Sequence, residues 1–161
     1  MTELQSVLTL LSDHHVDFVV IGGVAATLHG STYLTYDIDL CYDRKPANIA
    51  RLASALAPYH PKLRDVAEDV PFVFGEQTIR SGLNFMLSTD LGNVDLFGEL
   101  PGIGFFEEVS SLAETVELFS RQFLVLTIDG LIAAKKAAGR DKDLLVAREL
   151  EEIKAKLRGK E

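Results

Sequence analysis

The sequence predicts a mixed α/β (α+β) fold, in which a small mixed sheet is flanked by helices and two further helices follow at the C-terminus. Short runs rich in β-branched residues alternate with segments whose apolar residues recur at helical spacing. No internal repeat interrupts this alternation over the 161 residues. A chain of this length is expected to form one domain, residues 1–161, with residues 130–161 as a C-terminal helical appendage.

The first quarter of the chain predicts two helices and two strands. Apolar residues at helical spacing predict a helix over 2–14, and the β-branched run at 18–21 predicts a buried strand. Two glycines end that strand, and good helix formers follow at 24–29. Residues 36–42 alternate between polar and apolar side chains, so we expect a second strand that carries carboxylates on one face.

The rest of the chain predicts further strands and three long helices. Pro46 is suited to the first turn of a helix that runs to about residue 57. An irregular stretch over 58–70, a short strand over 72–74 and a glycine-rich loop over 100–106 are also expected. The remaining elements follow from apolar runs and turn residues. They are a hairpin of strands 83–88 and 94–97, strands at 116–118 and 123–126, and helices at 128–138 and 141–157.

Composition excludes several classes of protein. The single cysteine, Cys41, rules out a disulfide framework and a cysteine-rich zinc site. The longest apolar stretch, 18–28, is too short to span a bilayer and contains two glycines, so we expect a cytoplasmic protein that does not enter a membrane. With 16 basic and 24 acidic residues the net charge is −8, which disfavours general binding of nucleic acid.

Three carboxylates are candidates for a metal site. Asp37 and Asp39 are two residues apart on an expected strand and therefore share a face, and Asp95 lies between apolar neighbours on a second strand. If the two strands are neighbours, the carboxylates converge and need a cation, for which Mg²⁺ or Mn²⁺ is suited. The alternative is that the first two line the wet face of an edge strand and that Asp95 is a turn residue.

Gly22-Gly23, between a strand and a helix, is a candidate phosphate-binding turn. Glycines let phosphate oxygens approach the backbone, and the first N–H groups of the following helix point toward them. The alternative is a tight turn in which glycine is needed only for its conformation or for close packing. Thirteen residues separate Gly23 from Asp37, enough for one short helix, a loop and the start of a neighbouring strand.

In combination, these motifs resemble the nucleotidyltransferase fold superfamily, the DNA polymerase β-like group. Its pattern of a Gly-Gly or Gly-Ser turn, an Asp-x-Asp pair and a third carboxylate on a later strand is matched in order by segments 21–25, 35–40 and 94–96. The fuller strings, including 131–144, look like the small bacterial branch that contains AbiEii-type toxins of toxin–antitoxin systems.

The resemblance implies a role for each matched residue. Gly22, Gly23, Thr35 and Lys135 would bind the nucleotide. Asp37, Asp39 and Asp95 would hold Mg²⁺ or Mn²⁺, and Asp95 would also act as base toward the acceptor. The implied reaction moves an NMP group from an NTP to a hydroxyl of a tRNA, a protein or a small molecule, with release of pyrophosphate.

Two departures from the pattern leave a second function open. The second turn position is Gly23 instead of serine, and Tyr33-Leu34 stands where many relatives have arginine; Arg80, Arg140 or Lys142 could supply the missing cation. The alternative is a catalytically degenerate binding module, possibly one half of a toxin–antitoxin-like pair with a cognate protein partner. A third reading is an α/β protein whose carboxylates only bind a structural cation.

Overall fold

The computed structural model describes residues 3–159, and its central element is a seven-stranded mixed sheet with the strand order β3-β4-β5-β2-β1-β9-β8. In chain order, the strands of this sheet are β1 (Phe18–Ile21), β2 (Ile38–Tyr42), β3 (Lys62–Leu63), β4 (Asn84–Thr89), β5 (Gly92–Phe97), β8 (Ala113–Leu118) and β9 (Arg121–Leu126). Two short strands, β6 (Glu99–Leu100) and β7 (Gly104–Phe105), pair with each other separately. The predicted mixed α/β class is therefore confirmed.

The centre of the sheet joins strands that are far apart in the sequence. β2 runs antiparallel to β1 and parallel to β5, and β1 is also parallel to β9. The expected hairpin is present, because β4 and β5 pair antiparallel over their whole length. In the β2–β5 register, Asp39 lies directly opposite Asp95, so the topology brings the carboxylates of two distant segments to one place.

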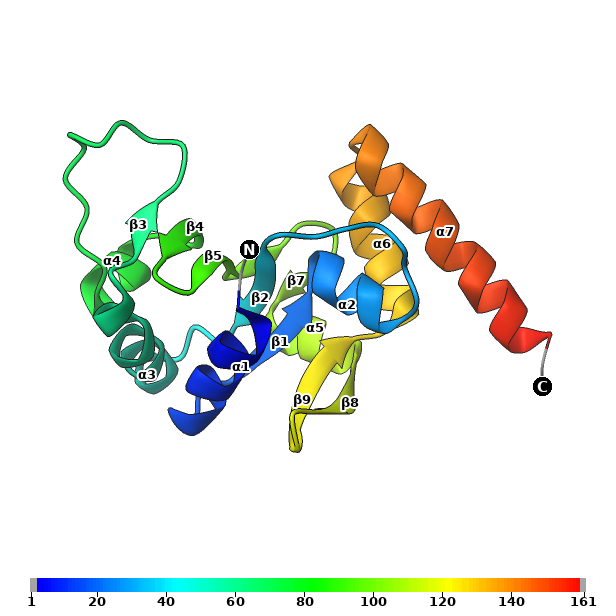
Figure 1. Cartoon of the computed structure of the whole chain (residues 1–161), viewed down its shortest axis with the longest axis horizontal. Helices are drawn as coiled ribbons and strands as arrows, with labels where there is room; N and C mark the ends of the chain where they lie inside the picture. The colour runs from blue at the N-terminus through cyan, green and yellow to red at the C-terminus, as the bar shows by residue number, and fades with distance from the viewer. Residues whose placement is uncertain (1–2, 160–161) are drawn as a thin grey trace.

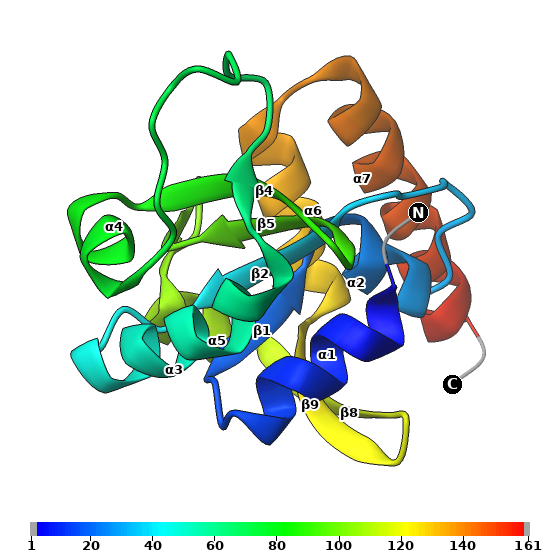
Figure 2. The same ribbon diagram turned by 60° about the vertical axis from the view of Figure 1, so that its left-hand side comes forward.

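Helices cover both faces of the sheet and extend beyond one end (Figure 1). They are α1 (Leu4–Asp13), α2 (Gly22–Leu28), α3 (Pro46–Leu56), the 3-10 turn η1 (Ala57–Tyr59), α4 (Glu76–Ser81), α5 (Phe106–Ser111), α6 (Ile128–Ala138) and α7 (Asp141–Arg158). Figure 2 shows α1 beside α3 on one face, while α6 and α7 form a helical pair at the C-terminal end. None of the helices in the described part of the chain has the length and apolar character needed to cross a membrane.

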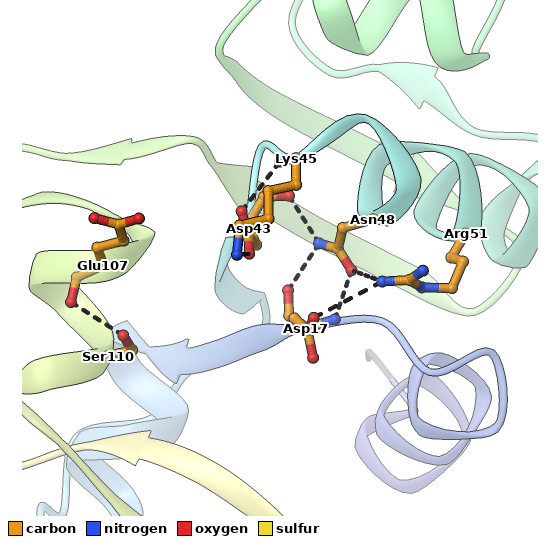
Figure 3. Close-up of polar contacts among 7 residues, drawn as sticks. All are labelled: Asp17, Asp43, Lys45, Asn48, Arg51, Glu107 and Ser110. Carbon is orange, nitrogen blue, oxygen red and sulfur yellow. Dashed lines mark hydrogen bonds and ion pairs between the residues drawn. The ribbon is translucent and has the colours of Figure 1, made fainter.

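A buried asparagine ties the outer ends of β1 and β2 together (Figure 3). Asn48, near the start of α3, is 1% exposed. Its amide nitrogen donates to the carbonyls of Asp17, at 3.0 Å, and Asp43, at 2.7 Å, and its amide oxygen accepts from the Asp17 N–H at 2.7 Å. Because every polar atom of this buried side chain is bonded, the network fixes the two strands that carry the candidate site.

Several element predictions are wrong in detail. No strand forms over 72–74; Phe72 and Phe74 instead pack half-buried against the core from an irregular segment that leads into α4. The aromatic and β-branched residues that favour a strand here pack on the core without a neighbouring strand to pair with. The irregular stretch expected over 58–70 contains β3, and the expected loop over 100–106 contains the β6–β7 pair and the start of α5.

Candidate active site

One cavity of about 750 Å³ collects all the residues that the motifs single out. It lies where the end of β1, the start of β2 and the middle of β5 meet the α6–α7 pair. The residues predicted from the sequence that line it are Gly22, Gly23, Thr35, Asp37, Asp39, Asp95 and Lys135. The two strands that carry the carboxylates are neighbours, which was the condition for the three groups to converge.

The glycine pair is required by close packing at this site. Gly22 has a positive φ of 65°, and a Cβ placed on it would lie 2.1 Å from Oδ2 of Asp39. A Cβ on Gly23 would lie 2.7 Å from the side-chain oxygen of Thr35. Both residues belong to the first turn of α2 instead of preceding it. The serine found at the second position in the resembled pattern would therefore collide with Thr35, which explains that departure sterically.

Thr35 places a hydroxyl beside the glycine turn. Its Oγ1 donates to the carbonyl of Asp37 at 3.1 Å, which fixes the segment that leads into β2. Asp37 itself precedes β2, although the alternating pattern had placed it within the strand. Its carboxylate accepts a hydrogen bond of 3.0 Å from the side-chain amide of Asn93, at the start of β5.

The carboxyls of Asp39 and Asp95 are neighbours in buried surroundings, which disfavours their charged forms. Burial, followed by the neighbouring Asp95 carboxyl, raises the pKa of Asp39 to about 7, and the charge of Lys135 only partly opposes this. Burial also raises the pKa of Asp95, which the guanidinium of Arg64 opposes. Two neighbouring carboxyls both ionise readily only when a cation compensates their negative charges.

Arg64 is a member of the site that sequence reasoning missed. Its Nη2 lies 2.7 Å from Oδ1 of Asp95 and 3.8 Å from Oδ2 of Asp37, and its Nη1 donates to the carbonyl of Leu87 at 2.8 Å. The residue follows β3 within a stretch that reads as irregular. Only the pairing of β3 with β4 brings it to the carboxylates, so no local signal in the sequence could have found it.

The opposite wall of the cavity, formed at the α6–α7 junction, is basic. Lys135, Arg140 and Lys142 line it. Asp143, 1% exposed, holds two of them, with its carboxylate 3.4 Å from Nζ of Lys135 and 2.6 Å from Nε of Arg140. Burial would raise the pKa of Asp143, but the hydrogen bonds from Arg140 and the charge of Lys135 lower it overall.

The candidate substitutes for the missing arginine therefore divide into two groups. Arg140 and Lys142 lie at the cavity, whereas Arg80 pairs with Glu76 within α4 and is not among the residues that line it. Tyr33 and Leu34 do line the cavity, and Leu34 is 84% exposed. The basic side chains thus come from the C-terminal helices instead of the loop before β2.

The donor set fits a hard divalent cation. Carboxylate oxygens are the ligands that Mg²⁺ and Mn²⁺ prefer. In addition, Oδ1 of Asp95 is a buried oxygen whose close neighbour is the charged Nη2 of Arg64, at 2.7 Å, and it accepts no well-aligned hydrogen bond from the described residues. The side chains are not arranged as a closed ligand cage, because no group of three or more acidic, histidine or cysteine residues within 3–159 is positioned to hold a metal as it stands.

Comparison with known proteins identifies the family. A family model described as "Nucleotidyl transferase of unknown function (DUF2204)" matches residues 1–160. A candidate nucleotidyltransferase from Thermotoga maritima, known from a crystal structure, is similar in fold, with a TM-score of 0.57, 17% identity, and coverage of 94% of this chain and 96% of that chain. The structure of ANT(2″)-Ia in complex with adenylyl-2″-tobramycin gives a TM-score of 0.54, 11% identity and coverage of 98% and 95%. No curated protein matches.

These matches confirm the predicted nucleotidyltransferase fold. They do not distinguish the branch with AbiEii-type toxins from other branches, so that finer assignment stays a prediction. The family model spans nearly the whole chain and rests on sequence, whereas the structural likenesses show the fold alone. The chain therefore belongs to the family of nucleotidyl transferases of unknown function that this model describes.

Proposed function

We propose that this nucleotidyltransferase moves an NMP group from an NTP to a hydroxyl acceptor in the described cavity, with Mg²⁺ or Mn²⁺ as cofactor. The observation that carries the proposal is the arrangement of the cavity walls. An acidic wall, with Asp37, Asp39 and Asp95, faces a basic wall that includes Lys135. A metal–triphosphate complex has the charge distribution that such a pair of walls would bind.

The basic wall and the glycine turn would bind the triphosphate. Lys135 is a point charge held in place by Asp143, and Arg140 presents a planar guanidinium held by the same carboxylate. Gly22 and Gly23 also line the cavity, and they would contribute their backbone N–H groups to phosphate binding. The hydroxyl of Thr35, beside Gly23, would turn its hydrogen from the carbonyl of Asp37 to a phosphate oxygen.

Asp95 would act as the base toward the acceptor. Its carboxyl lines the cavity on β5, directly opposite Asp39 on β2, and burial raises its pKa in the metal-free protein. The acceptor hydroxyl loses its proton to this carboxylate as its oxygen forms a bond to the α-phosphorus, and the bond from that phosphorus to the β-phosphate oxygen breaks to release pyrophosphate. A divalent cation bound by Asp37, Asp39 and Asp95 would supply charge compensation for the attacking and leaving oxygens.

The acceptor proposed is a small cationic molecule bearing a hydroxyl, ahead of a tRNA or a protein. The net charge of −8 and the acidic wall favour a cationic acceptor over a polyanion. The structural neighbour ANT(2″)-Ia was determined with an adenylylated aminoglycoside, which is a precedent for that chemistry on this fold. The proposal includes a cytoplasmic location, because the reaction uses an NTP as donor.

One observation favours a second candidate function, a catalytically degenerate binding module with or without a protein partner. Arg64 pairs with two of the three carboxylates that a metal would need. A binding module predicts nucleotide binding without pyrophosphate release. It would also predict binding that does not depend on a divalent cation.

Calorimetric titration of each NTP with and without Mg²⁺ tests the proposal. Wild type should bind at least one NTP in a Mg²⁺-dependent manner, and Asp37→Asn should bind it about tenfold more weakly or not at all, because a metal ligand is lost. Asp65→Asn is the matched control, since Asp65 is an exposed carboxylate that lines the same cavity. Equal binding by Asp37→Asn and wild type would contradict the metal role, and no binding by wild type would contradict the proposed function.

A further inference from the structure

The guanidinium of Arg64 contacts both β4 and the carboxylates. One arm is attached to β4 through the hydrogen bond of 2.8 Å from Nη1 to the carbonyl of Leu87. The backbone N–H of Arg64 also donates to the carbonyl of Met86 at 2.9 Å. The other arm, Nη2, contacts Asp95. Since the side chain is only 19% exposed and arginine keeps its proton, a permanent positive charge is built into the acidic wall.

This charge lies where a divalent cation would have to bind. Mg²⁺ needs oxygen ligands at about 2.0–2.1 Å. Arg64 Nη2 is already 2.7 Å from Oδ1 of Asp95 and 3.8 Å from Oδ2 of Asp37. Two like charges cannot share one carboxylate oxygen at such distances without strong repulsion.

The surroundings of Arg64 allow it to move. It stands directly after the two-residue strand β3, at the start of a long irregular segment that projects from the body of the protein (Figure 2). Residues 65–71 of that segment are all exposed. Nη1 and Nη2 of the guanidinium have different partners, so a rotation of the side chain could break the contact of Nη2 with Asp95 while Nη1 stays on the carbonyl of Leu87.

We propose that Arg64 is a positioning residue that competes with the divalent cation for Asp95, so that cation binding displaces the guanidinium from the carboxylate site. In the metal-free protein Arg64 compensates the charge of the converging carboxylates and lowers the affinity for the cation. The cation and Arg64 therefore alternate on the same oxygen. This inference rests on the proposed function, because it takes the three carboxylates as the metal ligands.

Direct binding of Mn²⁺ in the absence of nucleotide tests the inference. The free ion is followed by electron paramagnetic resonance at pH 8, which is above the pKa of about 7 of Asp39 in the metal-free protein. Arg64→Met keeps an apolar stem without the charge and should bind Mn²⁺ about tenfold more tightly than wild type. Arg64→Lys keeps the charge and should stay closer to wild type. Arg80→Met is the matched control, because it removes the same charge from a residue that does not line the cavity.

The outcomes separate the inference from the proposed function. Equal or weaker Mn²⁺ binding by Arg64→Met, with clear binding by wild type, would overturn the competition and leave the metal site standing. If neither protein binds Mn²⁺, the carboxylates are not a metal site and the proposed function fails with the inference. Introducing Asp37→Asn into Arg64→Met should abolish the gain in affinity.

A second measurement observes the Arg64 guanidinium in wild type, and a variant is used only to assign its signal. In wild type, the ¹⁵N resonances of the Arg64 guanidinium should shift when Mg²⁺ is added, because the contact with Asp95 is lost. The signal is assigned by its absence in Arg64→Lys. Resonances that stay unchanged while Mg²⁺ binds would overturn the inference.

Discussion

The buried carboxyl of Asp39 should make the metal-free protein less stable as the pH rises. Its pKa is about 7 in the folded protein, against 3.8 for an ordinary aspartate. In the range between these values the folded state holds a proton that the unfolded state has lost, so the free energy of unfolding falls with increasing pH. At about 1.4 kcal/mol for each pKa unit, roughly 2 to 3 kcal/mol of stability should be lost between pH 5 and pH 8.

Asp39→Asn removes this titration and should therefore be relatively stabilised at high pH. The assay is urea unfolding in the presence of a chelator at pH 5 and pH 8, followed by circular dichroism, since the chain contains no tryptophan. The difference in unfolding free energy between Asp39→Asn and wild type should grow by roughly 2 to 3 kcal/mol between the two pH values. The control Asp65→Asn removes an exposed carboxylate from the same cavity and should show no comparable growth.

If the difference in unfolding free energy between Asp39→Asn and wild type is the same at pH 5 and pH 8 to within about 0.5 kcal/mol, the reasoning is refuted. Ordinary surface substitutions change the free energy of unfolding by that much. A wild type that gains stability relative to Asp39→Asn as the pH rises would also refute the reasoning. Added Mg²⁺ should reverse the trend at pH 8, since a ligand that binds only the folded state stabilises it. The asparagine variant should lose most of that stabilisation.

Three further perturbations follow from packing and hydrogen bonding. Gly22→Ala should lower the free energy of unfolding by at least ~1–2 kcal/mol in urea titrations, because the new Cβ meets Asp39 in a left-handed backbone conformation; no loss would contradict the packing. Asp143→Asn should weaken NTP binding about tenfold in calorimetry by freeing two basic side chains, while Asp141→Asn should not, and equal affinities would argue against a basic phosphate wall. Asn48→Ala should lower the free energy of unfolding by ~3 kcal/mol in thermal or urea unfolding, since it leaves buried backbone groups unpaired; a loss below ~1 kcal/mol would contradict the role of the Asn48 hydrogen bonds.

Most of the candidate site could be predicted from the sequence because its parts are local motifs. Gly22-Gly23 and the Asp37/Asp39 pair are each contained in a segment of two or three residues. Both can therefore be recognised even when the ends of the neighbouring strands are not known. The prediction that Asp95 supplies the third carboxylate requires that its strand lie beside the strand of Asp39. The parallel pairing of β2 with β5 satisfies that requirement and places Asp39 opposite Asp95.

The parts that could not be predicted depend on contacts between distant segments. Arg64 reaches the carboxylates only because β3 pairs with β4, and a two-residue strand leaves no periodic pattern in the sequence. Phe72-Val73-Phe74 has the residue types of a strand, yet these residues form an irregular segment that packs its two rings on the core. The steric reason for Gly23 likewise appears only when Thr35 is seen beside it.

The most direct test of the central claim is transfer of label from α-³²P NTPs together with release of pyrophosphate. Purified protein with Mg²⁺ is incubated with each nucleotide and with separate pools of aminoglycosides, tRNA and protein. Wild type should label one pool and release one pyrophosphate per label transferred, and Asp95→Asn should do neither while still folding. Nucleotide binding without pyrophosphate release in any pool would contradict catalysis and favour the binding module, and unchanged transfer by Asp95→Asn would contradict the assigned site.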